Sequence, residues 1–208
     1  NSVSPGTVNE ESYPDESDEI RCLIPHGDAL WFGTEDEATP LYGDSIDTFG
    51  FSEVAGFQVG MAGRNAGLSC PFGMAFLSYD KQLYLYPSRY APTSGEDVTT
   101  SLIELSRPLR TELEQIKGTD FHNVHLVYYG YGRRKWLVLC YQREDSTYKT
   151  WVFDFEIRGW FELAKGLSAL AVFEVSKGKK VLLGGYPTDN KVYVLDDLTS
   201  TYAGSGNF

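Results

Sequence analysis

Hydrophobic residues recur in short runs with a period of two along most of this chain, and Gly, Pro, Asn and Asp separate the runs. In residues 150–163, Trp151, Phe153 and Phe155 alternate with other side chains, and Arg158-Gly159 follow as a polar connection. Because a β-strand directs successive side chains to opposite faces, the alternation predicts a strand, and Arg158-Gly159 predict a reversal into a second strand. The pattern therefore predicts a hairpin, and similar hairpins recur along the sequence.

The same pattern predicts strands on both sides of many short turns. We expect strands at 20–24, 29–34, 39–43, 51–59, 71–78, 82–86, 124–129, 135–141, 150–157, 160–163, 167–175, 180–185 and 191–196, with a loop at 60–70. Only residues 106–118 have helical spacing, with Leu109, Leu113 and Ile116 on one face, a Pro near the start and a Gly at the end. We expect one helix there.

The strands group into units of roughly 40 residues, the size of a propeller blade. We therefore predict an all-β fold over residues 20–202, an incomplete or degenerate β-propeller of four-stranded antiparallel blades with one short helix. Four such units make only part of a usual ring, so sheet faces and edges stay uncovered unless further sequence or a partner closes it. A Greek-key sandwich is the structural alternative.

The two ends of the sequence differ from this domain. Residues 1–19 contain Pro, Ser and acidic residues but few apolar ones, which predicts a flexible acidic arm or linker. Residues 203–208 are expected to connect to further sequence or to a tail. The absence of an initial Met suggests that the sequence was cut from a longer polypeptide.

The net charge of −11 is unevenly distributed. Residues 1–53 hold 13 acidic residues and one base, whereas residues 54–208 hold 16 acidic and 17 basic residues. An acidic chain repels a phosphate backbone, so direct nucleic-acid binding is not expected. The acidic residues either solvate a loop-rich segment or form an edge that meets a basic neighbour. The candidate interface residues in this segment are Glu35, Asp36 and Glu37.

A second candidate interface is the basic sequence Arg133-Arg134-Lys135, close to Tyr128, Tyr129 and Tyr131. Bases among aromatic residues are found where proteins bind single-stranded nucleic acid or glycans. A charged hairpin tip that protects a sheet edge from aggregation explains the same residues. We treat this tip as a contact surface for assembly.

Cysteine and hydropathy patterns exclude several classes of protein. Cys22, Cys70 and Cys140 are too widely spaced for a disulfide framework or a zinc site, so buried free thiols are expected and secretion is not supported. No apolar run approaches the roughly 20 residues of a membrane helix, and no signal-peptide pattern begins the sequence. We expect no membrane association.

Candidate chemistry is sparse. His122 and His125 would point to opposite faces of a strand, which argues against a metal site, and Pro25-His26-Gly27-Asp28 is typical of a turn rather than of a catalytic pair. Carboxylates near strand ends could form a glycosidase pair, but acids at strand ends usually only contact solvent. These carboxylates are Asp154, Glu156, Asp196 and Asp197. We predict no catalytic, cofactor-binding or metal-binding residue and no cofactor.

Gly184-Gly185-Tyr186, followed by residues 192–196, resembles a kelch repeat without its downstream Trp. The two glycines are explained equally well by a bulge where backbones approach closely. Kelch-like protein recognition therefore stays a third functional alternative.

Four groups of segments resemble the β-propeller-like structural virion proteins of tailed bacteriophages, of the head-to-tail or tail-accessory type. They are residues 24–34 with 40–43, residues 73–84, residues 151–154 with 159–160, and residues 183–196 with 201–202. The resemblance implies a packing role in a particle, without catalysis or cofactor, and no functional residue carries over from it.

From this resemblance we expect a structural component of a phage neck or tail, located in the virion and assembled in the host cytoplasm. Its expected partners are other virion proteins and copies of itself in a homo-oligomer. The alternative is a carbohydrate-binding or glycan-cleaving propeller, in which Tyr and Trp stack on sugars, so a glycan is a second expected class of ligand.

Overall fold

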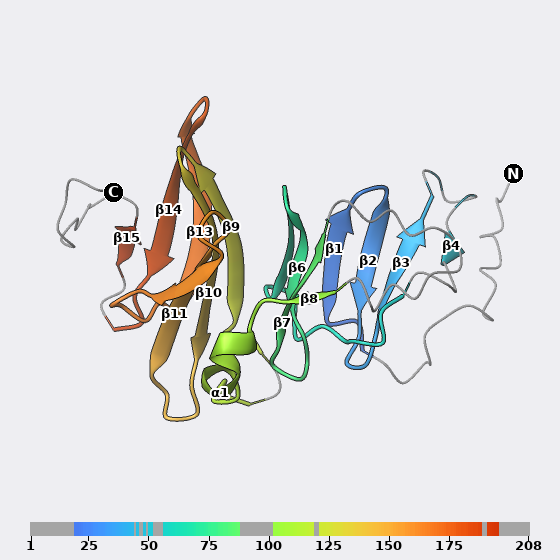
Figure 1. Ribbon diagram of the computed structural model, residues 1–208, viewed down its shortest axis with the longest axis horizontal. Helices are drawn as coiled ribbons and strands as arrows, with labels where there is room; N and C mark the ends of the chain where they lie inside the picture. Colours follow the sequence, from blue (N-terminus) through green and yellow to red (C-terminus); the bar gives the residue numbers. More distant parts are fainter. Residues whose placement is uncertain are drawn as a thin grey trace, which may run out of the picture.

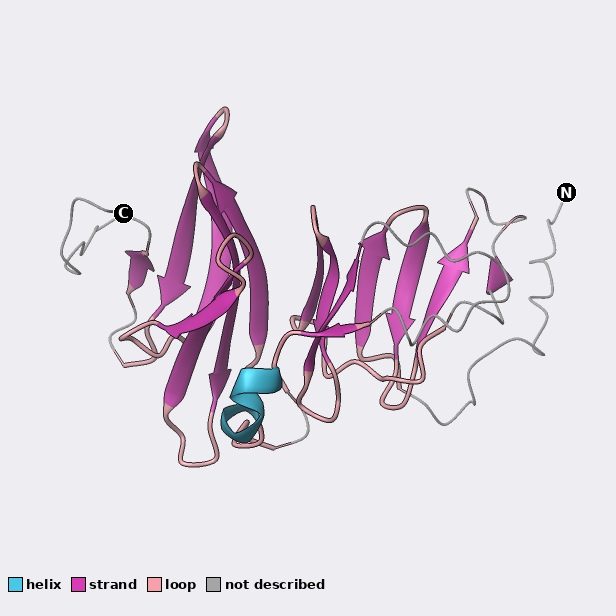
Figure 2. Cartoon of the chain, in the orientation of Figure 1, coloured by secondary structure: helices cyan, strands magenta, loops and turns pink. Residues whose placement is uncertain are grey.

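The described part of the chain consists of strands connected by turns, with one short α-helix (Figure 2). The computed structural model describes residues 19–43, 45, 48, 50–51, 56–87, 102–118, 121–188 and 191–195. The expected arm at 1–19, except its last residue, and the expected connection at 203–208 lie outside this part. The predicted all-β class and the presence of one short helix are confirmed.

The strands form four antiparallel sheets, each made of consecutive strands that pair in chain order. The first sheet holds β1 (Cys22–His26), β2 (Ala29–Gly33), β3 (Ala38–Tyr42) and β4 (Gly50–Phe51). The second holds β5 (Gly67–Cys70), β6 (Gly73–Leu77), β7 (Leu83–Pro87) and β8 (Ile103–Glu104). The third holds β9 (His125–Tyr131), β10 (Arg134–Gln142), β11 (Tyr148–Asp154) and β12 (Gly159–Glu162). The fourth holds β13 (Ala169–Ser176), β14 (Lys179–Gly185) and β15 (Val192–Val194).

Successive sheets meet through their first strands. β1 contacts β5, β5 contacts β9, and β9 contacts β13 and β14. In Figure 1, β1 and β9 lie toward the middle of the molecule, whereas β4 and β15 lie at opposite ends. The sheets therefore follow one another in chain order, with the first strand of each beside the first strand of the next. The described strands contain neither a closed propeller nor a Greek-key connection.

The hydrophobic core is divided into three clusters, one between each pair of successive sheets. The second sheet shows how alternation builds two of them: Met74 and Phe76 of β6 pack toward the first sheet, while Ala75 and Leu77 pack toward the third. A strand that is buried on both faces needs apolar residues at consecutive positions, as in this run. The middle sheets are thus apolar on both faces.

Aromatic side chains fill the cluster between the first and second sheets. Trp31 is buried and stacks on Phe57 with ring centroids 4.7 Å apart. Phe57 in turn meets the edge of the Tyr86 ring at 5.0 Å. Such offset and edge contacts add to the large apolar area that aromatic residues bury.

The predicted hairpin at 150–163 is formed by β11 and β12, but its reversal differs from the prediction. The turn begins at Phe155 and ends at Arg158, which adopts a positive φ of 52°, and Gly159 already pairs with Asp154. The expected reversal at Arg158-Gly159 is therefore only partly present, because Arg158 ends the turn whereas Gly159 belongs to β12. The turn starts earlier than expected because Asp154 Oδ1 accepts a hydrogen bond from the Glu156 backbone N–H.

Three other elements also differ from expectation. Residues 67–70 were expected in a loop but form β5, and β8 was not predicted. Instead of one helix over 106–118, a 3₁₀ turn (Arg107–Leu109) precedes a short α1 (Arg110–Leu113). The helix stops because Ile116 bridges Arg143 and the Lys117 N–H donates to the Gln142 carbonyl, so the chain pairs with the end of β10 instead.

The strand expected at 51–59 is only partly present. β4 ends at Phe51, residues 52–55 lie outside the described part, and Phe57 pairs with Ala38 as an isolated bridge.

Candidate functional site

The outer face of the fourth sheet is apolar and exposed. Leu170, Val172 and Leu182 pack against the third sheet, so the residues that alternate with them point away from it. The pairings Ala171 with Leu183, Phe173 with Val181, and Leu183 with Val194 align the outward residues in rows across the strands. We call this surface the last face; it consists of Ala171, Phe173, Val181, Leu183, Val192 and Val194.

Large side chains on the last face contact solvent. Phe173 is 58% exposed and Val192 is 47% exposed. Single exposed hydrophobic residues are ordinary, but contiguous apolar patches mark interaction sites. In the part of the chain that the structure describes, the first three sheets each have another sheet on the side that follows them in sequence, and the fourth has none.

The first sheet also has an outward face with apolar residues. Ile24 and Trp31 pack toward the second sheet, and Leu23, Pro25, Leu30 and Leu41 alternate with such residues on β1 to β3. Leu23 is 53% exposed. Phe32, which pairs with Leu23, lies on the same surface. We call this second surface, made of Leu23, Pro25, Leu30, Phe32 and Leu41, the first face.

The segments that contain the first and the fourth sheet differ in charge. Residues 19–43, which contain β1 to β3, hold five acids and one base, a balance of −4. Residues 164–195, which contain β13 to β15, hold five lysines and two acids, a balance of +3. The acidic candidates Glu35, Asp36 and Glu37 belong to the negative end.

Within the acidic candidates, two residues are already engaged in local contacts. The Arg21 guanidinium lies 3.1 Å from Glu35 Oε2 and stacks over the Tyr79 ring. The Glu37 N–H donates to Thr34 Oγ1, which closes the β2–β3 turn. The acidic candidates thus form a structured turn on the first sheet.

The basic candidates lie at the β9–β10 turn of the third sheet. Arg133 is exposed, Arg134 lies over the Trp136 ring at 5.0 Å, and Lys135 Nζ is 2.9 Å from Glu156 Oε1. The second sheet separates this tip from the acidic turn, so the structure does not bring the two candidate surfaces together. The role of the tip in assembly stays a prediction.

The carboxylates considered for glycoside hydrolysis have structural partners where they are described. Asp154 Oδ2 accepts a hydrogen bond from Trp136 Nε1 at 3.0 Å, and its other oxygen caps the following turn. Glu156 forms the ion pair with Lys135. Asp196 and Asp197 lie outside the described residues. The contacts of Asp154 and Glu156 stabilise the third sheet.

The histidines also have structural surroundings. Pro25 and His26 belong to β1 rather than to the expected turn, which consists of Gly27 and Asp28. His26 Nδ1 lies 2.9 Å from Ser69 Oγ and joins the first sheet to the second, and burial lowers its pKa. Burial, together with the charge of Arg64, lowers the pKa of His125. No group of three metal-ligating side chains occurs among the residues that the structure describes.

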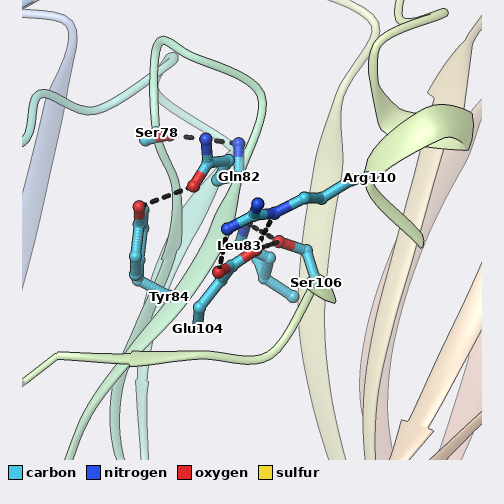
Figure 3. Close-up of polar contacts among 7 residues, drawn as sticks. All are labelled: Ser78, Gln82, Leu83, Tyr84, Glu104, Ser106 and Arg110. Carbon is cyan, nitrogen blue, oxygen red and sulfur yellow. Dashed lines mark hydrogen bonds and ion pairs between the residues drawn. The ribbon is translucent and has the colours of Figure 1, made fainter. Parts of the chain in front are cut away.

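A polar cluster connects the second sheet to the helix (Figure 3). Arg110 Nε donates to Glu104 Oε1 at 2.7 Å, and this hydrogen bond lowers the pKa of the Glu104 carboxyl. Ser106 Oγ donates to the same carboxylate and accepts the Leu83 backbone N–H at 2.9 Å. Its members satisfy one another, so the cluster fixes β8 and the start of α1 against β7.

Gly184, the first residue of the double glycine, packs against two leucine side chains. A Cβ atom at this position would lie 2.8 Å from Leu167 Cδ1 and 3.0 Å from Leu195 Cδ1. Both leucine side chains therefore pack on the strand at Gly184, and their flexible ends would have to shift to admit a larger residue. These contacts are with side chains rather than backbone, and the register shift of this sheet lies at Glu174 and Ser176, so the bulge expected at Gly184-Gly185 is not present.

Sequence analysis located the fourth sheet but missed the last face. The signal was the run 169–173, Ala-Leu-Ala-Val-Phe, in which both alternating sets are apolar. Such a run predicts a strand that needs cover on two faces, and the structure provides a described neighbour on one of them.

No protein-family model and no curated protein matches this chain. Within the described part, no helix has the length and hydropathy needed to cross a membrane.

Proposed function

We propose that this chain is a structural assembly module that acts by binding other proteins, without catalysis and without a cofactor. The observation that carries the proposal is the exposed last face. Fully burying a large apolar side chain stabilises a protein or complex by about 1.5–3 kcal/mol, so covering Phe173 and its neighbours gives a partner a substantial driving force.

In this proposal the four sheets are consecutive blades of an incomplete β-propeller. Propeller blades are antiparallel sheets, typically four-stranded, arranged around a central channel. Support comes from the strand order within each sheet, from the adjacency of the first strands, and from a hydrophobic cluster between each pair of successive sheets. The last face is the side of the fourth blade that has no described neighbour.

We place the module in the neck or tail of a tailed-phage particle, assembled in the host cytoplasm beside other virion proteins. The support for this setting is the resemblance of the hairpin sequences. An assembly role agrees with it, because a virion protein functions through the contacts that its surfaces make.

The test is mass spectrometry of purified particles of the phage that encodes the chain, after a high-salt wash. Peptides of the chain are expected to sediment with the particles at a constant ratio to the major structural proteins. Amine cross-linking is expected to join Lys177 or Lys179, at the β13–β14 turn beside the last face, to another polypeptide. Finding the peptides only in the unsedimented fraction would overturn the virion role.

A further inference from the structure

We propose that turns at one end of the third and fourth sheets form a basic surface that binds an acidic segment of a neighbouring protein. The surface is made of residues 131–135 at the β9–β10 turn, residues 155–158 at the β11–β12 turn and residues 174–180 at the β13–β14 turn. We call it the basic rim. This inference rests on the proposed assembly function and names the chemistry of one partner.

The basic rim differs in charge from the rest of the chain. Its three segments hold seven bases and two acids, a balance of +5, whereas the whole chain has a net charge of −11. The bases are Arg133, Arg134, Lys135, Arg158, Lys177, Lys179 and Lys180. A local excess of one sign of charge attracts and orients a partner of the opposite sign.

Contacts between the turns hold the basic rim together. Lys135 Nζ lies 2.9 Å from Glu156 Oε1, which joins the first turn to the second. The Tyr129 hydroxyl donates to the Lys180 carbonyl at 3.2 Å, and β9 contacts β13 and β14, which joins the first turn to the third. In Figure 1 the β9–β10 and β13–β14 turns lie at the same end of the molecule, at the top of the view.

The described residues do not neutralise the charge of the basic rim. Its two acids have local partners, because Glu156 pairs with Lys135 and Glu174 Oε1 accepts the Gly178 backbone N–H at 2.9 Å. Five exposed bases of the rim form no ion pair with any described residue: Arg133, Arg158, Lys177, Lys179 and Lys180. Four bases elsewhere in the described chain each pair with a carboxylate.

The basic rim lies on turns and not on a sheet face. Successive sheets of this chain stack face to face, with a hydrophobic cluster between them. A further sheet stacked on the fourth would cover its face and leave the turns in contact with solvent. The rim is therefore a surface for a partner that approaches the ends of the strands.

A short acidic protein segment fits the basic rim better than a nucleic acid. Arginine and lysine form charge-assisted hydrogen bonds with carboxylates. The rim supplies +5 of the net −11, so the rest of the chain carries −16 and repels a strand that extends past the rim. Single-stranded nucleic acid also stacks on successive aromatic residues. Of the two aromatic residues in the rim segments, Tyr131 is exposed, whereas Phe155 stacks on Phe72 at 4.0 Å.

The experiment measures binding of a fluorescent oligoglutamate peptide to the 208-residue chain by anisotropy, at low and at physiological salt. Wild type is expected to bind the peptide, and more weakly as salt rises, because exposed charges are screened. The double variant Arg133→Glu, Lys179→Glu is expected to bind about tenfold more weakly, because two attractive contacts become repulsive. An unchanged affinity would overturn the inference.

A matched control reverses one Arg and one Lys outside the basic rim. The double variant Arg64→Glu, Lys117→Glu changes the net charge by the same amount, and both residues are exposed. The Lys117 N–H donates to the Gln142 carbonyl, at the end of β10 opposite the rim. This control is expected to bind like wild type. An equal loss in both double variants would show that only net charge matters, which contradicts a site at the rim.

Carbodiimide coupling locates the contact in wild type without any substitution. The reagent joins a lysine amine to a carboxylate that lies in contact with it. With oligoglutamate bound, peptide mass spectrometry is expected to find adducts on Lys177, Lys179 or Lys180 and none on Lys117. Adducts distributed evenly over the exposed lysines would overturn the inference.

A fluorescent oligothymidylate separates the two classes of partner. Tighter binding of oligothymidylate than of oligoglutamate, lost in the rim variant, would assign the surface to nucleic acid and overturn the inference. A chain that stays with washed particles but does not bind oligoglutamate would also overturn it, and would leave the assembly role standing. Binding at the rim by a chain that is absent from every particle would support the inference and overturn the virion role.

Discussion

Cys140 lies fully buried in β10, and burial raises the pKa of its thiol to about 12. The pKa of Cys22 is raised to about 11 for the same reason. A thiol is nucleophilic as the thiolate, and these two stay protonated at neutral pH. They therefore act as small apolar side chains that fill the core.

Burial of Cys140 makes the stability of the protein depend on alkaline pH. Above its ordinary pKa of 9.0 the thiol ionises in the unfolded chain but keeps its proton in the native state. The native state then binds more protons, so stability falls as pH rises from 9 towards 12, by at most about 1.4 kcal/mol per pH unit for one group. In urea titrations, the stability of wild type minus that of Cys140→Ala should shrink by about 1–2 kcal/mol between pH 8 and 10.5; a constant difference would contradict the assignment.

The burial of single residues could be predicted where it follows from a pattern in the sequence. The buried thiols were expected from the spacing of the cysteines, and the structure confirms that all three are buried. Side-chain hydrogen-bond partners could not be predicted. Trp136 and Asp154, for example, lie 18 residues apart and meet only through the β10–β11 register. The positive φ of Arg158 depends likewise on where Asp154 starts the turn.

At the scale of elements, Thr150 illustrates how one residue holds the connection between two sheets. It is buried in β11, its Oγ1 accepts the Leu167 N–H at 2.9 Å, and its carbonyl accepts the Leu163 N–H. These bonds direct the chain from β12 toward the fourth sheet.

Replacing Thr150 with Val keeps the side-chain volume and removes the acceptor. The buried Leu167 N–H then loses its partner, and we expect a loss of about 1–3 kcal/mol in the free energy of unfolding. Thr150→Ser is the control, because it keeps the hydroxyl and loses only a methyl group. Equal losses in the two variants, measured by urea unfolding, would show that packing rather than the hydrogen bond matters.

The elements themselves were largely predictable from period-two alternation, since hairpins are local and turn residues mark their ends. The exceptions have physical causes. The sequence analysis missed β5 because this strand begins with Gly67 and follows a segment rich in Gly and Asn. It missed β8 because a strand of two residues is too short to show an alternation of apolar and polar positions. The helix was overestimated because its spacing competes with pairing of residues 116–117 to the end of β10, a tertiary effect.

At the scale of the whole molecule, the order of the sheets followed from the repeat of hairpins, but the end faces did not. Their exposure depends on which neighbours exist, and a repeat pattern looks the same in a middle sheet and in an end sheet. The apolar run in β13 indicated two faces that need cover, and only the folded arrangement shows which one lacks a described neighbour.

The chain-order arrangement of the sheets also has a consequence for synthesis on the ribosome. Each sheet is made of consecutive strands and packs on the sheet before it, so the chain can fold progressively from its N-terminal side while the rest is still being translated. Every newly completed sheet presents an apolar surface on which the next one condenses. In the described part of the chain, the last face is the surface of this kind on which no further sheet has condensed.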